Sequence, residues 1–298
     1  MPFFHWLNKI DNDKIKGNMK KLFISFLAII LVLPCAIVFS GCEKKKENNS
    51  IDFWDGTTTA INKTENDIIE IDSAEDLAGL AKEVNNGNSF DNILFKLTID
   101  IDLSNREWTP IGYCANSWQG KSFNGIFDGQ EHVIYNLKIS KKEEGSLGVG
   151  LFGFVQGTIK NLKIENANIV GNGYVGTLAG KVLNKDNLFS GTISNCHVKN
   201  VRIFANYFDV NKKGDHAGSL IGQINSFNVT NCSIVDATIY ADSFAGQFAG
   251  VKMDCESKDC ISKNTVQRVE VVYNETGKGL NILTGQNIKN EFFGYETN

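Results

Sequence analysis

The sequence predicts an all-β fold, a right-handed parallel β-helix that begins with a short capping α-helix. Two short patterns repeat and alternate along the chain, and β-branched runs punctuated by Gly and Asn lie between them. The 298 residues include 28 Gly but only 3 Pro, which suits many short strands joined by turns. Interleaved repeats of this kind indicate a stack of similar units, each covering the apolar face of its neighbour.

The first repeated pattern is an aliphatic residue, any residue, Asn, then Leu or Cys, any residue and another aliphatic. The copies are centred on Asn136, Asn161, Asn195 and Asn231, with a looser fifth copy around Asn264. Their spacings are 161−136 = 25, 195−161 = 34, 231−195 = 36 and 264−231 = 33. Equivalent strands would stack about 4.8 Å apart, placing Asn on Asn. Stacked Asn side chains can hydrogen-bond along the stack, and Asn tolerates a left-handed corner.

The second pattern is a pair of glycines in a short apolar run, with copies that begin at Gly148, Tyr174, His216 and Phe244. We expect these glycines to allow positive φ at other corners of each unit. Crossovers between parallel strands are almost always right-handed, which gives the predicted handedness.

The chain before the repeats predicts a cap for the stack. Residues 71–84 have the spacing of an amphipathic helix, with Leu77, Leu80 and Val84 on one face. Ser73 stands three residues before Asp76, a variant of the capping box. Residues 95–103 alternate like a strand and would start the first coil.

An export signal is predicted over residues 19–41. Lys20 and Lys21 precede an uncharged, mostly apolar run, and Ser40 and Gly41 come directly before Cys42. The run Phe39-Ser40-Gly41-Cys42 resembles the lipobox of bacterial lipoproteins, although Phe39 stands where Leu is usual. The resemblance implies cleavage before Cys42 and lipid on its sulfur, so that the membrane is a partner through that lipid. The alternative is an uncleaved transmembrane helix.

These observations divide the chain into segments. Residues 1–18 are interpreted as an upstream extension or the product of a start codon assigned too early, and residues 19–41 as the signal peptide. Residues 42–66 are polar and are predicted to form a flexible tether. Residues 67–298 would form the β-helix domain.

A family resemblance supports this domain. The runs DIDLS at 100–104, WTPIG at 108–112 and FNGIFDG at 123–129, with the later glycine copies, resemble GLUG-motif proteins. That family includes surface proteins and accessory regions of secreted bacterial proteases, so the resemblance implies an adhesin-like scaffold. It covers residues 71–271 and implies no activity, because the motif is a scaffold repeat.

No catalytic, metal-binding or cofactor-binding residues are predicted. The 4 histidines form no His-Glu-x-x-His motif, and neither a Gly-x-Ser-x-Gly turn nor a phosphate loop is present. Asp100 and Asp102 share a strand face, as paired catalytic carboxylates would. We favour a structural role for both, and a turn at Asp128.

Cysteines and loops supply the remaining candidates. Cys255 and Cys260 could close a small disulfide loop, while Cys196 and Cys232 occupy equivalent repeat positions, either as a disulfide or as buried thiols. Insertions in a solenoid form outer loops that often bind ligands. The candidate ligand-contact residues are Tyr207 and Phe208 in the long link over 204–215, and Trp118 outside it.

The leading functional hypothesis is a cell-envelope or surface lipoprotein whose β-helix serves as an adhesion or ligand-binding scaffold. Its partner would be a glycan or a host or cell-surface protein. The net charge of −4 argues against a nucleic acid. The alternatives are a carbohydrate-active enzyme, either a polysaccharide lyase or a glycoside hydrolase, and a structural envelope protein.

Overall fold

The computed structural model describes residues 51–61, 68–115, 119–140, 147–184, 191–205, 216–241, 244–253, 256–263, 265–271, 281–282 and 293–297. Two compact units are present, Met1–Asn48 and Asn49–Asn298, and every described residue belongs to the second. The predicted signal peptide and Cys42 therefore lie outside the described residues. Among those that are described, none belongs to a helix with the length and apolarity that a membrane crossing requires.

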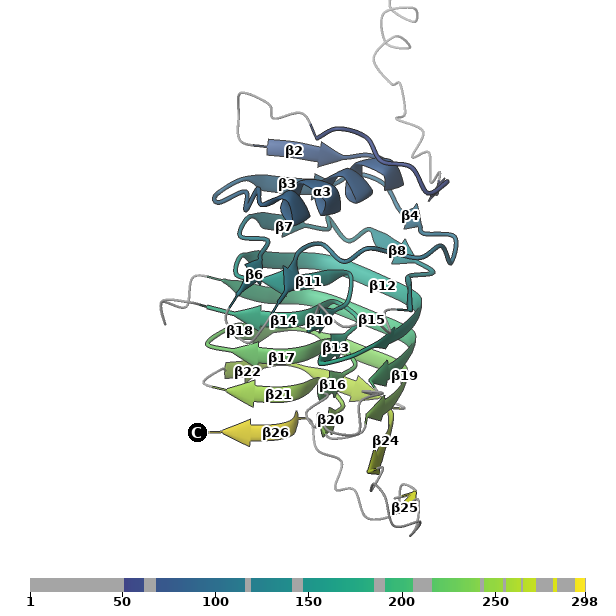
Figure 1. The fold of residues 1–298 in the computed structure, drawn as a ribbon, viewed down its shortest axis with the longest axis vertical. Coiled ribbons are helices and arrows are strands. Elements are labelled where there is room, and N and C mark those ends of the chain that lie inside the picture. The colour runs from purple at the N-terminus through teal and green to yellow at the C-terminus, as the bar shows by residue number, and fades with distance from the viewer. Residues whose placement is uncertain are drawn as a thin grey trace, which may run out of the picture. The chain divides into compact units, whose positions relative to one another are not determined.

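Most of the described strands belong to one large sheet (Figure 1). Its main path is β1 (Asp52–Phe53), β4 (Ile101–Asp102), β8 (Val133–Tyr135), β12 (Thr158–Gly171), β15 (Thr192–Ala205), β19 (Ser233–Ala241), β24 (Val266–Val271) and β25 (Asn281–Ile282). Beside this path lie β2 (Ile68–Ile71), β3 (Leu94–Leu97), β7 (Ile126–Asp128), β9 (Lys138–Ser140), β18 (Asn228–Thr230), β22 (Glu256–Lys258) and β23 (Ile261–Lys263). The pairs are parallel except β24 with β25.

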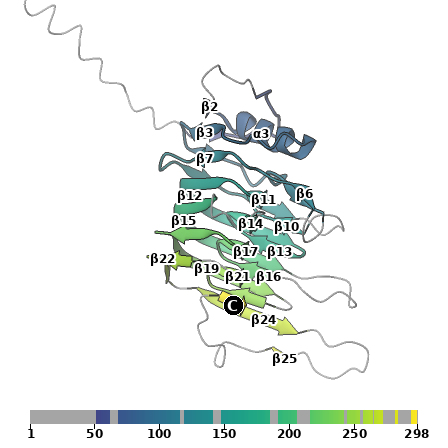
Figure 2. The same cartoon turned by 90° about the vertical axis from the view of Figure 1, so that its left-hand side faces the viewer.

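Two smaller parallel sheets complete each repeat. One contains β10 (Gly148–Val149), β13 (Tyr174–Gly176), β16 (His216–Gly218) and β20 (Phe244–Gly246). The other contains β11 (Phe152–Val155), β14 (Ala179–Leu183), β17 (Ile221–Asn225), β21 (Ala249–Met253) and β26 (Phe293–Thr297). β5 (Tyr113–Cys114) and β6 (Gly120–Lys121) form an antiparallel pair. In the repeats each strand pairs with its counterpart in the next unit, so the strands of each sheet follow one another in chain order, from top to bottom in Figure 2.

The register places like residues on one another. Ile159 pairs with Ile193, Leu162 with Cys196 and Ile164 with Val198, and all these side chains are at most 1% exposed. The mostly parallel β-structure and the stacked repeats predicted from the sequence are confirmed. Stacking of aliphatic residues buries apolar surface continuously from unit to unit, which stabilises the stack by about 25 cal/mol per Å².

Each of these units has two left-handed corners, and most of the corner residues are asparagines. The first corner holds Asn161, Asn195 and Asn231, with φ of 54°, 53° and 50°. Asn195 Nδ2 donates to Asn161 Oδ1 over 3.0 Å, and Asn231 Nδ2 donates to Asn195 Oδ1 over 3.1 Å. The predicted stacking of Asn at left-handed corners is confirmed for these units. We call this row of residues the Asn ladder.

The register differs from the prediction at both ends of the repeat array. Asn136 does not stack on Asn161, because Tyr135 pairs with Glu165 and Asn136 therefore aligns with Asn166 in the second corner. This explains the short spacing of 25 between Asn136 and Asn161. The fifth copy is also wrong in register, because Thr230 pairs with Lys258 and the following residue, Asp259, takes the corner with φ 55°.

A carboxylate begins the Asn ladder. Asn161 Nδ2 donates to Asp128 Oδ1 over 2.9 Å, and Lys160 Nζ lies 3.2 Å from the other oxygen of Asp128. Burial disfavours the ionised form, but the hydrogen bonds from Asn161 and the Gln130 amide outweigh it and keep the pKa of Asp128 below its ordinary value. An ionised carboxylate can only accept hydrogen bonds, so it suits the end of the ladder towards which the amides donate.

The repeated glycines have a different role from the one predicted. None of the motif glycines has a positive φ; the described glycines that do are Gly56, Gly87, Gly112 and Gly173. Instead, a Cβ added to Gly180 would lie 2.1 Å from Val149 N, and one added to Gly222 would lie 2.4 Å from Val175 N. These glycines therefore let the two smaller sheets approach each other more closely than any side chain would allow.

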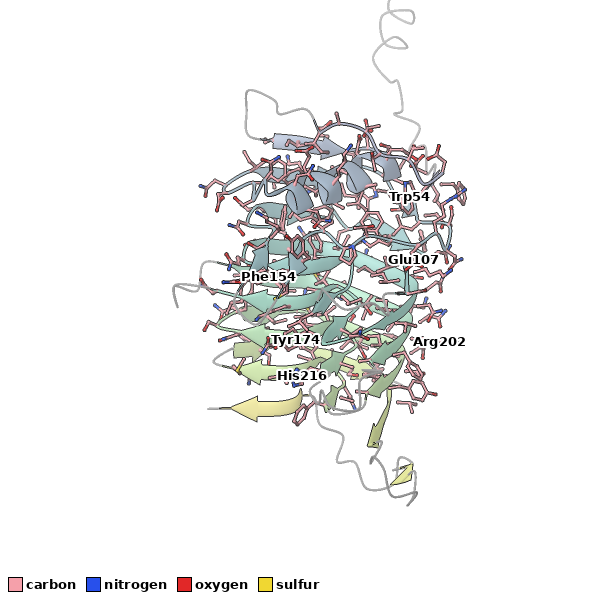
Figure 3. The ribbon with its side chains drawn as sticks, in the orientation of Figure 1. Trp54, Glu107, Phe154, Tyr174, Arg202 and His216 are labelled. Carbon is pink, nitrogen blue, oxygen red and sulfur yellow. The ribbon has the colours of Figure 1, made fainter. Side chains whose placement is uncertain are left out.

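Aromatic residues line the same sheets. The rings of Tyr174 and His216 stack with centroids 5.3 Å apart, and Phe244 continues the row at 5.0 Å (Figure 3). The Lys181 ammonium lies 5.2 Å from the Tyr174 ring centroid and 5.9 Å from that of Phe154. Burial lowers the pKa of Lys181, because few solvent molecules remain to hydrate its charge. Cation–π contacts partly offset that loss.

The predicted helix is confirmed as α3 (Ala74–Asn86), beside β2 and β3 at the start of the stack (Figure 1). Ser73 is its N-cap, and the Ser73 side chain accepts a hydrogen bond from Asp76 N over 3.2 Å. Leu77, Leu80 and Val84 are buried as expected. The strand predicted over 95–103 is interrupted, since β3 ends at Leu97 and β4 begins at Ile101.

The predicted tether over residues 42–66 is too long. β1 pairs with β4 inside this range, and Trp54 is only 7% exposed. The reason is that Trp54, within the polar stretch, supplies apolar surface that is buried against Trp108, whereas Phe53 stays exposed. The folded unit therefore includes residues 51–61.

The Asn ladder predicts how two substitutions of one residue should differ. Asn161→Ala loses the ladder bonds and places Ala at positive φ, so it should lower the free energy of unfolding by about 2–3 kcal/mol. Asn161→Gly loses only the bonds and should cost about 1 kcal/mol. Urea unfolding measures both. The control Asn168→Ala, exposed on the same strand, should change stability by less than about 0.5 kcal/mol. Equal losses for the Ala and Gly variants would contradict the account.

Candidate ligand-binding site

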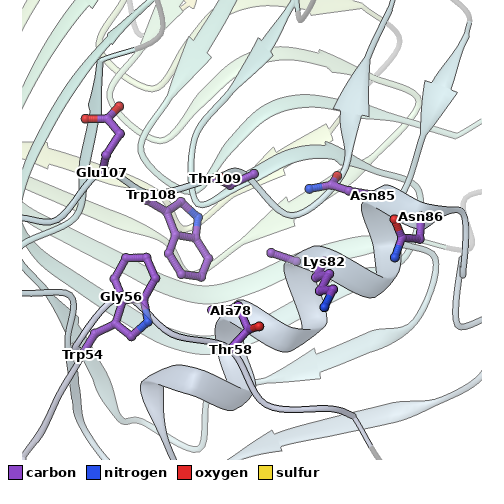
Figure 4. Close-up of a pocket in the computed structure, with 11 residues that line it drawn as sticks. Trp54, Gly56, Thr58, Ala78, Lys82, Asn85, Asn86, Glu107, Trp108 and Thr109 are labelled. Atoms are coloured by element: carbon purple, nitrogen blue, oxygen red, sulfur yellow. The ribbon is translucent and has the colours of Figure 1, made fainter.

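The residues predicted to contact a ligand cannot be placed. Trp118, Tyr207 and Phe208 all lie outside the described residues. A cavity occurs elsewhere, between α3 and the chain on either side of it, with a volume of about 430 Å³. Its lining residues are Trp54, Gly56, Thr58, Ala78, Ala81, Lys82, Asn85, Asn86, Glu107, Trp108 and Thr109 (Figure 4). We call this cavity the tryptophan pocket.

Two indoles form one wall of the tryptophan pocket. The rings of Trp54 and Trp108 meet edge to face, with centroids 5.4 Å apart and planes at 70°. Trp54 Nε1 donates to Thr57 O over 2.8 Å and Trp108 Nε1 donates to Leu151 O over 3.1 Å. Because both N–H groups are bonded to the protein and the side chains are only 7% and 1% exposed, the indoles are held in place and offer a ligand a small area of carbon surface.

The segment after β1 closes the pocket against α3. Asp55 Oδ1 accepts hydrogen bonds from the Thr57 amide and hydroxyl at 2.8 and 2.6 Å, a turn that brings the chain back over the helix. Thr59 N then donates to Glu75 O over 3.1 Å. Gly79 makes this crossing possible, because a Cβ there would lie 2.3 Å from Thr59 O.

Polar groups from two walls surround the opening. Lys82, Asn85 and Asn86 come from α3, whereas Glu107 and Thr109 flank Trp108. Asn85 Nδ2 donates to Pro110 O over 3.0 Å, which orients the amide. Within the described part of the chain, the buried Asn85 Oδ1 has no hydrogen-bond partner. The pocket therefore combines a fixed apolar wall with charged groups and an acceptor that a ligand donor could satisfy.

The candidate carboxylates are bonded within the scaffold. Asp100 Oδ1 accepts from Val133 N over 3.0 Å and lies 2.9 Å from His132 Nδ1. Asp102 accepts the Asn136 amide at 2.9 and 2.8 Å. Each carboxylate therefore hydrogen-bonds to the neighbouring unit, as expected for a residue with a structural role.

The cysteines form a row across three units. Cys196, Cys232 and Cys260 carry free thiols. The hydrogen bond between the thiols of Cys232 and Cys196, together with burial, raises the pKa of Cys232. The structure places Cys260 beside Cys232, while Cys255, its predicted disulfide partner, lies outside the described residues. Among the described residues, no three Cys, His, Asp or Glu side chains gather as metal ligands would.

Comparisons with known proteins give partial likenesses. No protein-family model matches the chain. The chain is 34% identical over 141 residues to halomucin of Haloquadratum walsbyi, a match that covers 42% of this chain and 2% of halomucin. A solved structure from Bacteroides ovatus, titled as a candidate immunoglobulin A1 protease, is 18% identical with a TM-score of 0.41 and covers 80% of this chain and 87% of that one. Neither likeness transfers an activity to this chain.

The sequence does not predict the tryptophan pocket, because its two indoles lie in segments with different predicted structures. Trp54 lies in the range predicted as a tether, and Trp108 lies in the predicted scaffold motif WTPIG. A signal for the pocket did exist. A Trp in an otherwise polar stretch is on average highly buried, so Trp54 indicates an ordered segment.

Gly79 gives a test of how the pocket is closed. In an exposed helix Gly→Ala stabilises by about 1 kcal/mol. Here the added methyl would strike the Thr59 carbonyl, so Gly79→Ala should destabilise the protein by about 1–3 kcal/mol and lower Tm in differential scanning fluorimetry. Lys82→Ala, exposed on the same helix, is the control and should leave Tm nearly unchanged. A rise in Tm for Gly79→Ala would show that the segment does not cross the helix there.

Proposed function

We propose that this protein is an exported bacterial lipoprotein that binds a carbohydrate in the tryptophan pocket. In this proposal the domain is a right-handed parallel β-helix of the GLUG-motif kind, held to a membrane through lipid on Cys42. The observation that carries the binding function is the pocket itself. Its 430 Å³ lie within the range of small-molecule sites, about 300–1,000 Å³.

Pocket chemistry favours a sugar over an apolar ligand. The small area of indole carbon that Trp54 and Trp108 leave exposed suits contact with the C–H groups of a pyranose ring. Around them, Lys82, Asn85 and Asn86 supply donors and acceptors for hydroxyl groups. The unpartnered Asn85 Oδ1 favours a ligand that donates a hydrogen bond, because a buried acceptor left unpaired costs about 1–3 kcal/mol.

The stacked parallel sheets support a β-helix. Strands of the large sheet and of the two smaller sheets alternate along the chain, and each pairs with its counterpart in the next unit. Such crossovers between parallel strands favour a right-handed path. The residues that precede the described fold support the anchor, since Lys20 and Lys21, the apolar run and Ser40-Gly41-Cys42 have the order of a lipoprotein signal.

Glycan-array and calorimetric binding by the detergent-solubilised full-length protein test the ligand. We expect binding to at least one oligosaccharide, and Lys82→Ala and Asn86→Ala, at exposed rim positions, should each weaken it about tenfold. Lys199→Ala, on the outer face of β15, is the control and should bind normally. If the rim variants bound as tightly as the wild type, the ligand would bind outside the tryptophan pocket. If the wild type bound no glycan, the carbohydrate-binding proposal would be wrong.

The anchor is tested by metabolic labelling with an alkyne fatty acid. Labelling is expected on the wild-type protein and should disappear in Cys42→Ala, which should also keep the mass of residues 1–41 because cleavage requires the lipidated cysteine. Equal labelling of both proteins would contradict attachment at Cys42. A membrane-bound, uncleaved wild-type protein would favour the transmembrane alternative.

A further inference from the structure

A Ser–His–Asn arrangement lies on β15 and β19, away from the tryptophan pocket. His197 and Ser233 are directly paired across the two parallel strands. His197 Nδ1 lies 2.8 Å from Ser233 Oγ, and His197 Nε2 lies 3.0 Å from Asn195 Oδ1. His197 and Ser233 are both partly exposed, so a small molecule can reach them. A hydroxyl bonded to an imidazole that a third group orients is the arrangement of an activated nucleophile.

The Asn ladder fixes the direction of these hydrogen bonds. Asn195 Nδ2 donates to Asn161 Oδ1, and Asn195 Oδ1 accepts from Asn231 Nδ2, so the amide of Asn195 has one allowed orientation. Its oxygen can only accept from His197, which places the imidazole proton on Nε2. Nδ1 then carries the lone pair and accepts the hydroxyl proton of Ser233, as a general base must.

The surroundings keep His197 neutral. Burial lowers the pKa of His197 below its ordinary value of 6.5, and the attraction of Glu131 and the repulsion of Lys163 are smaller effects of opposite sign. Lys163 pairs with His197 across β12 and β15 and binds Glu131 at 3.1 Å. Lys199, the next residue on this face of β15, lies 3.7 Å from Glu165. A neutral imidazole near pH 7 is available as a base.

We propose that Ser233 is a nucleophile that accepts acyl groups from small esters, with His197 as its general base and Asn195 as a positioning residue. This activity is independent of the pocket and of any ligand bound there. Ser233 Oγ bonds to the ester carbonyl carbon as the carbon–alkoxy bond breaks. The hydroxyl proton passes to His197 Nδ1 and then to the leaving alcohol. His197 then takes a proton from water as the water oxygen bonds to the acyl carbon. The bond from that carbon to Ser233 Oγ breaks, which releases the acid, and the proton on His197 passes to Oγ.

An alkyl fluorophosphonate probe tests the nucleophile in the full-length protein. Ser233 Oγ would bond to phosphorus as fluoride leaves, and peptide mass spectrometry would locate the adduct. We expect a label on Ser233 that is absent in Ser233→Ala and forms at least about 100-fold more slowly in His197→Gln. Ser262→Ala is the control: the hydroxyl of Ser262 pairs with Thr265 rather than with a histidine, and its loss should change nothing.

The pH dependence of labelling tests the roles of His197 and Asn195. The rate should be constant above pH 7 and fall as pH drops through the pKa of His197, below 6.5, because the protonated imidazole cannot accept a proton. Asn195→Asp keeps an acceptor at the corner and adds negative charge, so labelling should persist with its midpoint at higher pH. Asn195→Gly should slow labelling about tenfold. A purely structural role would lower the Tm of Asn195→Gly but leave the labelling rate of the folded protein unchanged.

Two labelling results would overturn this proposal. The first is the absence of an adduct on Ser233 in wild-type protein whose Tm shows that it is folded. The second is a labelling rate in His197→Gln equal to that of the wild type. Hydrolysis of p-nitrophenyl acetate provides a second measurement, and equal rates for wild type and Ser233→Ala would also contradict it. If Ser233→Ala fails to fold, Ser233→Thr keeps a hydroxyl bonded to His197 and should retain a measurable rate.

Discussion

The structure depends on a one-way chain of side-chain amides at the corners of its repeats. Asn231 donates to Asn195, Asn195 donates to Asn161, and Asn161 donates to the carboxylate of Asp128. Among the common side chains, Asn combines tolerance of a left-handed backbone with both a donor and an acceptor. Strands that stack about 4.8 Å apart place each amide within reach of the next. The ladder therefore fixes the register, and the register sets which aliphatic residues meet in the core and which polar residues meet outside.

The side of the stack formed by the smaller sheets is held by close contact. Because Gly180 and Gly222 have no side chain, the backbones of the two smaller sheets pack directly against each other at these positions. Tyr174 and His216 stack beside them and Lys181 lies over the Tyr174 ring. The large sheet is ordered by polar ladders and the smaller sheets by glycine contacts, which is why two different patterns alternate in the sequence.

The sequence predicts features that recur from unit to unit and features set by a local motif. Aligned aliphatics and left-handed asparagines are of the first kind and the Ser73 cap is of the second, and all are present. The features that it does not predict depend on contacts between segments that do not repeat. The spacing pattern alone could not show that Asn136 belongs to the second corner, because that depends on the pairing of β8 with β12.

The candidate sites differ in this respect. The approach of Trp54 to Trp108 needs the tertiary structure before it becomes visible, whereas that of Ser233 to His197 follows from the predicted stacking, because each lies two residues after a ladder asparagine. In the second case the ladder does more than hold the fold, since it decides which imidazole nitrogen of His197 carries the proton. A scaffold interaction thus sets the chemistry of a surface residue.

A double-mutant cycle measures most directly whether the amides act as a connected chain. Asn161→Gly and Asn195→Gly, singly and together, keep a residue suited to the left-handed corner and remove adjacent rungs, and urea unfolding gives each free energy. The account predicts a coupling of about 0.5–1.5 kcal/mol between Asn161 and Asn195, and almost none between Asn161 and Asn200, which lies in the other corner. Additive losses for the adjacent pair would show that the corners are held independently and would contradict the central role of the ladder.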